Sequence, residues 1–187
     1  MATRLGYKIG KLFTNSGRRT YLIEFANELA KKNKYKIFIC DVNENVSTNF
    51  ISKNIIFFKT PKVTDNKKEY IKCLFKNCLK YKINIIFPLM DFELDVLSIN
   101  KELFEKKKIK VVVSESKFIK NCLNKLNFYK FCVKNSINTP KIYLNFDKKN
   151  RSKLIMKEIR GSGSNNQSIV NKKNFLKLQN GYFLQKY

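Results

Sequence analysis

The sequence contains no histidine and no tryptophan, and its 14 acidic residues are far outnumbered by 39 lysines and arginines. Without histidine there is no Ser-His-Asp or Cys-His triad, no histidine general base and no histidine zinc ligand. The cysteines form no C-x-x-C pair and show no metal-ligand spacing. We expect reduced, mostly buried thiols at all of these positions: Cys40, Cys73, Cys78, Cys122 and Cys132.

Long apolar runs are also missing. No stretch approaches the roughly 20 apolar residues that span a membrane. The first residues lack the apolar core and cleavage pattern of a secretory signal, so we expect a short leader and a cytoplasmic protein. Apolar residues make up 43% of the 187 positions, which is typical of a globular chain with one domain, or one domain and a smaller piece.

The formal charge of +25 favours anionic partners. One interpretation is a basic module that binds nucleic acid or another polyanion. The other is compositional, since lysine, asparagine and isoleucine are abundant along the whole chain, as in proteins from AT-rich genomes. Lysine runs such as Lys106–Lys108 fall where helices or loops are expected to meet solvent. We therefore treat nucleic-acid binding as the alternative and expect the charge to attract small anions, ATP included.

Short apolar strands alternate with amphipathic helices through the first two-thirds of the chain. This alternation predicts βαβ units and an open, doubly wound parallel sheet of the Rossmann type, with ligands at the carboxyl ends of its strands. Those ends carry Asn15 to Arg19, Asp41, Thr60 and Asp91. Strands are predicted at 9–14, 35–40, 54–58, 83–87 and 109–113, with helices at 20–33 and 68–81 and one more that carries Leu94, Leu97, Leu103 and Phe104.

The pattern changes after residue 114. A small α+β lobe with mostly antiparallel strands is predicted there. The chain is thus divided into a leader at 1–7, a Rossmann-like domain at 8–113 and a second lobe at 114–187. Helices are predicted at 116–124, 126–135 and 172–178, and strands at 141–144, 153–159, 167–170 and 182–187.

The first strand runs into the turn Asn15-Ser16-Gly17-Arg18-Arg19 and then into a helix. Backbone N–H groups at a helix N-terminus, together with two arginines, favour binding of a substrate anion. The other interpretation is an ordinary βα turn with surface arginines. The turn is not a dinucleotide fingerprint, because it contains a single glycine.

Three acids, Asp91, Glu93 and Asp95, follow the fourth predicted strand. They could bind an amine or a metal. Alternatively, Asp91 caps the next helix while Glu93 and Asp95 complement its dipole. We expect the capping role for the last two and leave both roles open for Asp91.

A lysine-led loop, Lys157 to Ser164, lies between two β-like runs. Its backbone N–H groups and hydroxyls could surround phosphate oxygens while Lys157 supplies a point charge. A Gly-Ser linker is the simpler interpretation. The position of Lys157 within a strand, and of the loop within a hairpin, argues for the phosphate site.

Six motifs, taken in order, resemble the N-terminal half of an ATP-grasp ligase. They are S-G-R-R, P-L-M-D, N-K-L-N-F-Y-K-F, N-T-P-K, L-I-M-K-E-I-R-G-S-G-S and F-L-Q-K-Y. The resemblance is to the group with carbamoyl-phosphate-synthase-like or pyrrolysine-biosynthesis-ligase-like N-terminal domains, and it covers nearly the whole chain from about Lys8. It implies a preATP-grasp domain up to about residue 113, which helps to bind a carboxylate or amine substrate.

The resemblance also implies an ATP site. Lys125 and Lys157 match the two ATP-contacting lysines of the family, and the mobile phosphate loop is matched by Gly161, Ser162, Gly163 and Ser164. Gln185, Lys186 and Tyr187 match the hinge that holds the adenine. Family members use ATP and Mg²⁺ to convert a carboxylate into an acyl phosphate, which an amine then attacks.

Three departures from the family pattern stand out: Glu158 where proline is usual, Asn165-Asn166 where glycine is common, and Lys186 where the hinge is usually acidic. The family's C-terminal lobe, with its Mg²⁺ ligands and phosphate-stabilising arginine, has no counterpart in this sequence. We therefore expect negligible catalysis from this chain alone. The resemblance leaves open a truncated gene product, a fragment, a split enzyme with a separate C-terminal lobe, a non-catalytic remnant, and a homodimer.

Overall fold

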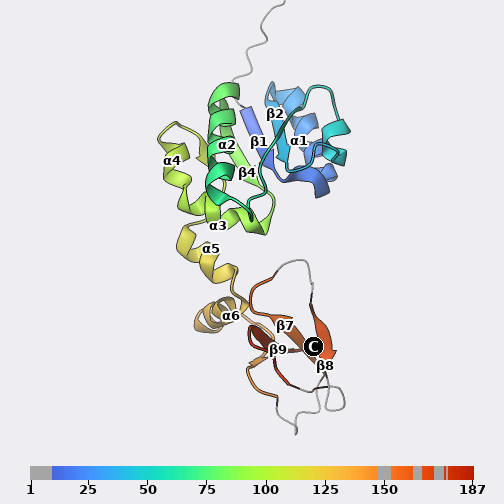
Figure 1. Ribbon diagram of the computed structural model, residues 1–187, viewed down its shortest axis with the longest axis vertical. Helices are drawn as coiled ribbons and strands as arrows, with labels where there is room; N and C mark the ends of the chain where they lie inside the picture. Colours follow the sequence, from blue (N-terminus) through green and yellow to red (C-terminus); the bar gives the residue numbers. More distant parts are fainter. Residues whose placement is uncertain (1–9, 147–152, 162–165, 171–174, 176) are drawn as a thin grey trace, which may run out of the picture. The chain divides into compact units, whose positions relative to one another are not determined.

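Figure 1 shows the computed structural model, which describes residues 10–146, 153–161, 166–170, 175 and 177–187. The chain divides into two compact units, one ending at Ser116 and the other comprising Lys117–Tyr187. Each unit is described by itself.

The first unit contains a five-stranded sheet in the order β3-β2-β1-β4-β5, and every neighbouring pair is parallel. The strands are β1 (Gly10–Thr14), β2 (Lys36–Asp41), β3 (Ile56–Lys59), β4 (Ile83–Pro88) and β5 (Lys110–Val111). The predicted open parallel sheet is therefore confirmed. Its strand order reverses between β1 and β4, which is where such sheets bind ligands.

The helices of this unit are α1 (Thr20–Asn33), α2 (Lys67–Tyr81), α3 (Asp91–Ile99) and α4 (Lys101–Glu105), with short 3₁₀ helices η1 (Ser16–Arg18) and η2 (Ser47–Phe50). Successive strand residues alternate between two apolar clusters, because neighbouring side chains point to opposite faces of a sheet. One cluster joins β1 and β2 to α1 through Phe13, Ile37, Ile39, Ile23 and Ala30. The other joins the same strands to α2, α3 and α4 through Leu12, Phe38, Cys40, Tyr70, Leu74, Leu97 and Phe104.

The packed face of a helix does not follow from apolar spacing alone. Phe25 and Leu29 recur at helical spacing in α1 but are 58% and 39% exposed, whereas Ile23, Asn27 and Ala30 are buried. Leu79 of α2 is likewise exposed. Apolar side chains lie on more than one face of these helices, so spacing alone does not identify the packed face.

The single helix predicted around Leu94–Phe104 is two helices. They are separated at Asn100, whose side-chain amide donates to the Val96 carbonyl at 2.8 Å. Strand β5, predicted at 109–113, also ends earlier than predicted. Val113 donates to the Val111 carbonyl in a tight turn that takes the chain away from the sheet after two ladder residues.

The second unit holds a four-stranded sheet in the order β6-β9-β7-β8, with antiparallel pairing throughout. Its strands are β6 (Ile142–Tyr143), β7 (Leu154–Glu158), β8 (Ser168–Val170) and β9 (Tyr182–Lys186). Its core is built on Leu154, Val170 and Leu184. Helix α5 (Ser116–Cys122) lies at the boundary between the units and α6 (Lys125–Lys134) follows it. The helix predicted at 172–178 falls mostly outside the described residues.

All the cysteines are free thiols. Cys40, Cys78 and Cys132 are buried and Cys73 is half-buried, but Cys122 is exposed, so the expectation of burial was wrong there. Within the described ranges, no helix is both long enough and apolar enough to cross a membrane.

Helix α2 ends at a lysine in an unfavourable conformation. Lys82 has a φ of 54° and a ψ of 45°, the left-handed region in which a side chain costs about 1 kcal/mol and glycine costs little. We expect Lys82→Gly to raise the free energy of unfolding by about 1 kcal/mol, measured by urea denaturation. Lys80→Gly, two residues earlier within the same helix, should lower it by about 1 kcal/mol. A loss of stability in Lys82→Gly would contradict the prediction.

Candidate functional site

A pocket of about 730 Å³ lies at the carboxyl ends of the parallel strands. It is lined by residues that follow β1, β2 and β3 and by the start of α3: Asn15, Gly17, Asp41, Val42, Asn45, Val46, Ser47, Lys62, Val63, Thr64, Met90 and Phe92. Its position agrees with the general rule for open α/β sheets. Two of the predicted anion-site residues, Asn15 and Gly17, therefore line a cavity of ligand size.

The end of β1 is held in place by a buried carboxylate. Asn15 adopts a left-handed conformation (φ 46°), and its side-chain amide donates to Glu93 Oε2 at 2.7 Å. The same oxygen accepts a hydrogen bond from the Tyr70 hydroxyl. Glu93 Oε1 accepts from the backbone N–H groups of Leu89 (2.8 Å) and Met90 (3.0 Å). Glu93 thus connects β1, α2 and the β4–α3 turn, well beyond the capping role predicted for it.

Burial near Glu93 changes the acidity of its neighbours. Burial of the Tyr70 hydroxyl, reinforced by the charge of Glu93, raises its pKa well above 10.0. The Cys40 thiol, also buried and close to Glu93, has a pKa raised well above 9.0 for the same reasons. Both groups therefore stay protonated at neutral pH, so the Tyr70 hydroxyl remains a hydrogen-bond donor to the carboxylate.

The turn predicted to hold an anion already has internal partners. The Gly17 N–H donates to Asp41 Oδ2 at 3.0 Å, so an anion at this N–H would have to displace a carboxylate. Ser16 is fully buried, and its hydroxyl hydrogen-bonds with that of Thr48 at 3.0 Å. Little space remains at Gly17, because a Cβ there would lie 2.9 Å from a methyl of Val46.

The remaining predicted residues of this site lie at its border. Arg19 is the N-cap of α1 and is exposed, while the side chain of Arg18 is outside the described part of the structure. Asp91 is also exposed. Of the two roles left open for Asp91, the capping role is wrong, because the N-cap of α3 is Met90 and Asp91 is the first helical residue.

In the second unit, Lys157 lies on β7 and is half-buried. Its ammonium group donates to the Gln185 side-chain oxygen on β9 at 2.8 Å. The register explains this contact: Gln185 pairs with Ile155, which is on the same face of β7 as Lys157. Two residues predicted for the ATP site are therefore in direct contact, although they are 28 positions apart.

Lys125 and Gly161 are also brought together. The Lys125 backbone N–H donates to the Ile159 carbonyl at 3.0 Å, and its ammonium group donates to the Gly161 carbonyl at 2.8 Å. The start of α6 is thus attached to the segment that leaves β7. Ser162, Gly163 and Ser164 lie outside the described residues.

The base of the loop is closed by a residue that the family pattern did not predict. Glu158 Oε1 accepts hydrogen bonds from the Asn166 amide and from the Tyr182 hydroxyl, both at 3.0 Å. The hydrogen bond to Glu158 raises the pKa of Tyr182. The departure from proline at this position therefore supplies a contact between the two ends of the loop. In the sequence, this contact was indicated by the glutamate that replaces the usual proline.

The predicted hinge residues occupy the end of β9. The backbone N–H of Lys186 donates to the Lys141 carbonyl at 3.0 Å, and that of Tyr187 donates to the Lys153 carbonyl at 3.1 Å. The side chains of both Lys186 and Tyr187 are exposed. In the described part of the chain, no cluster of three or more acidic or cysteine residues could hold a metal ion.

A parallel α/β unit followed by a small antiparallel sheet also occurs in solved structures of a ligase, a synthetase and a carboxylase. Residues 12–112 match the family model described as PylC-like, N-terminal domain. The chain belongs to this family, as its motifs predicted. No curated protein is similar enough in sequence to count as a relative.

Solved structures support the same fold at low sequence identity. The L-amino acid ligase from Bacillus licheniformis has a TM-score of 0.67 at 12% identity, covering 97% of this chain and 44% of its own. The N5-carboxyaminoimidazole synthetase from Staphylococcus aureus, complexed with ADP, has a TM-score of 0.63 at 13% identity. The match covers 96% of this chain and 47% of the synthetase.

The biotin carboxylase from Campylobacter jejuni, in a β-γ-ATP complex, has a TM-score of 0.63 at 13% identity. The match covers 95% of this chain and 45% of the carboxylase. The chain thus spans less than half the length of each of these structures.

Proposed function

We propose that this chain is the ATP-binding N-terminal portion of an ATP-grasp carboxylate–amine ligase. The observation that carries the proposal is that two pairs of residues predicted for the ATP site are in direct contact in the second unit. Lys157 reaches Gln185 across β7 and β9, and Lys125 reaches Gly161 at the start of the loop. Both lysines can turn toward a phosphate chain held by the loop.

The charge of Lys157 is well placed for this role. Its described partner is the neutral amide oxygen of Gln185, not a carboxylate, so the ammonium charge is not neutralised. A half-buried ammonium group attracts phosphate more strongly than an exposed one, because water screens it less. ATP would replace a neutral acceptor by negatively charged phosphate oxygens, so the ammonium group would gain a Coulombic attraction that Gln185 does not supply.

The reaction of the proposed enzyme transfers the terminal phosphoryl group of ATP to a carboxylate oxygen, releasing ADP. An amine then attacks the acyl carbon, releasing phosphate and a proton. We assign to the first unit the binding of the carboxylate or amine substrate in the pocket that contains Asn15, Gly17 and Asp41. Mg²⁺ would neutralise the phosphate charge when bound with ATP. This chain's residues bind and orient, and none is assigned as a general acid or base.

Calorimetric titration with Mg·ATP tests the nucleotide site. We expect saturable binding that Lys157→Met weakens about tenfold or more, because a charge-assisted hydrogen bond contributes about 1.5–3 kcal/mol. Lys130→Met, an equal loss of charge at an exposed position on α6, should leave the affinity within about twofold. The proposal fails if no saturable heat is observed, or if both variants weaken binding equally.

A further inference from the structure

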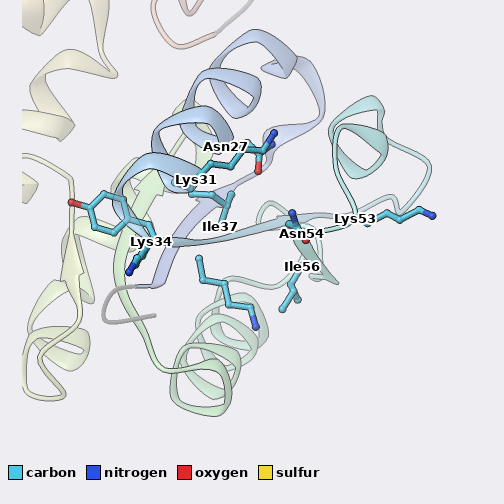
Figure 2. Close-up of a pocket in the computed structure, with 10 residues that line it drawn as sticks. Asn27, Lys31, Lys34, Ile37, Lys53, Asn54 and Ile56 are labelled. Carbon is cyan, nitrogen blue, oxygen red and sulfur yellow. The ribbon is translucent and has the colours of Figure 1, made fainter. Parts of the chain in front are cut away.

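A second pocket, of about 570 Å³, lies at the opposite end of the parallel sheet. Figure 2 shows its labelled residues, which come from the last turns of α1, from β2 and from the segment that leads into β3. These are the amino ends of β2 and β3, whereas the substrate pocket proposed above lies at the carboxyl ends. The two pockets share no lining residue.

Four lysines line this pocket: Lys31, Lys34, Lys36 and Lys53. No acidic residue lines it, and in the described part of the chain none of these ammonium groups is in an ion pair. In Figure 2, Lys34 and Lys53 lie on opposite sides of the pocket, and the Lys53 side chain extends away from the other labelled residues. The walls below are partly apolar (Ala30, Ile37 and Ile56).

Helix electrostatics accounts for only part of this charge. Lys31 and Lys34 lie at the end of α1, where cations complement the helix dipole. Lys36 begins β2, and Lys53 lies in the loop before β3, so neither lysine complements the dipole of α1. A further cation is near, since Lys11 Nζ lies 3.8 Å from the centre of the Tyr35 ring, which also lines the pocket.

A buried amide in the pocket wall gives independent evidence for a ligand. Asn27 is 8% exposed and occupies the inner face of α1 between Ile23 and Ala30, where an apolar residue would pack. Its side chain lines the pocket and has no hydrogen-bond partner among the described residues. Its polar atoms are not among the fully buried ones without a partner, so the amide faces the pocket, where a polar ligand can accept its hydrogen bonds.

We propose that this pocket binds a small phosphoanion with two or more phosphate charges. Lysines act as point charges for phosphate, and several of them around one cavity favour a multiply charged ligand over a single carboxylate. The volume is within the range of small-molecule sites, and the recessed apolar walls suit a compact ligand better than an extended nucleic-acid strand. The proposal does not depend on the nucleotide site at Lys157.

The test is calorimetric titration of the full chain with inorganic pyrophosphate, in a Lys157→Met background that removes the proposed nucleotide contact. We expect saturable binding that Lys31→Ala combined with Lys53→Ala weakens about tenfold or more. The matched control combines Lys32→Ala with Lys68→Ala. These exposed lysines give the same change in net charge but do not line the pocket, and they should change the affinity less than about twofold.

Asn27→Leu separates a ligand role from a structural one. If the amide serves the ligand, the variant binds pyrophosphate more weakly while its melting temperature changes little, because the amide makes no hydrogen bond within the described part of the fold. A lower melting temperature with unchanged binding would overturn the assignment of Asn27.

Three outcomes would overturn the pocket proposal. These are no saturable binding of pyrophosphate, equal weakening by the pocket and control pairs, and tighter binding of a single-stranded RNA oligonucleotide that depends on Lys32 and Lys68 as much as on the pocket lysines. Failure of Mg·ATP to bind the wild-type chain would contradict the proposed function and leave this proposal standing.

Discussion

Glu93→Gln is expected to lower the free energy of unfolding of the first unit by about 2–3 kcal/mol. Glu93 is completely buried, so water cannot replace a lost partner. Its two oxygens accept hydrogen bonds from Leu89, Met90, Asn15 and Tyr70. Glutamine offers one accepting oxygen and one donating amide, so the amide would face two donors. At least one donor would then remain buried without an acceptor.

Urea denaturation followed by circular dichroism measures this loss. Glu24→Gln, at an exposed position on α1, is the matched control and should change the stability by less than about 0.5 kcal/mol. Tyr70→Phe should cost about 1 kcal/mol alone and less in the Glu93→Gln background, because the two residues share one hydrogen bond. A Glu93→Gln variant as stable as the wild type would show that the carboxylate is not needed to hold Asn15.

Stability should also fall steeply above pH 9. Burial raises the pKa of Cys78 from 9.0 to about 12 and shifts Cys40 in the same direction. The protonated thiol is therefore favoured in the folded state. Its contribution is complete below pH 9.0 and is lost as the pH rises toward the folded value. For Cys78 alone the loss between pH 9 and 11 is about 2–3 kcal/mol, and Cys40 adds to it.

Denaturation series at stepped pH in a reducing buffer test this dependence. Cys78→Ala should flatten the curve between pH 9 and 11, although it lowers stability at neutral pH by removing a buried group. Cys122→Ala should alter the curve much less, because that thiol is exposed. If the Cys78→Ala and wild-type curves run parallel, the buried thiol is not the source of the alkaline loss.

The parallel sheet was predictable because each strand is a short apolar run and α-helices lie between most of the strands, although β2 and β3 are joined by a loop with only the short 3₁₀ helix η2. The boundaries of α1 matched the prediction of 20–33. What could not be predicted is which helix face packs. Phe25 and Asn27 illustrate this: the aromatic side chain is exposed and the amide is buried. Burial depends on the partner strand, and helical spacing alone does not identify that partner.

The contacts that form the candidate sites also could not be predicted from the spacing of residues in the sequence. Asn15 and Glu93 are 78 positions apart and meet only because β1 and β4 are neighbours in the sheet. The contact between Lys157 and Gln185 similarly depends on the register of β7 and β9. The family resemblance named both of those residues as parts of one site, whereas their direct hydrogen bond is a structural finding.

The outer strands of the parallel sheet have a consequence for the protein at high concentration. Exposed strand edges can pair with another molecule and start aggregation. Here β5 contributes only two residues and begins with the exposed Lys110, while β3 ends at the exposed Lys59. Each edge therefore carries a lysine that would have to lose water to join a second sheet. Part of the large positive charge thus serves to keep copies of this chain apart.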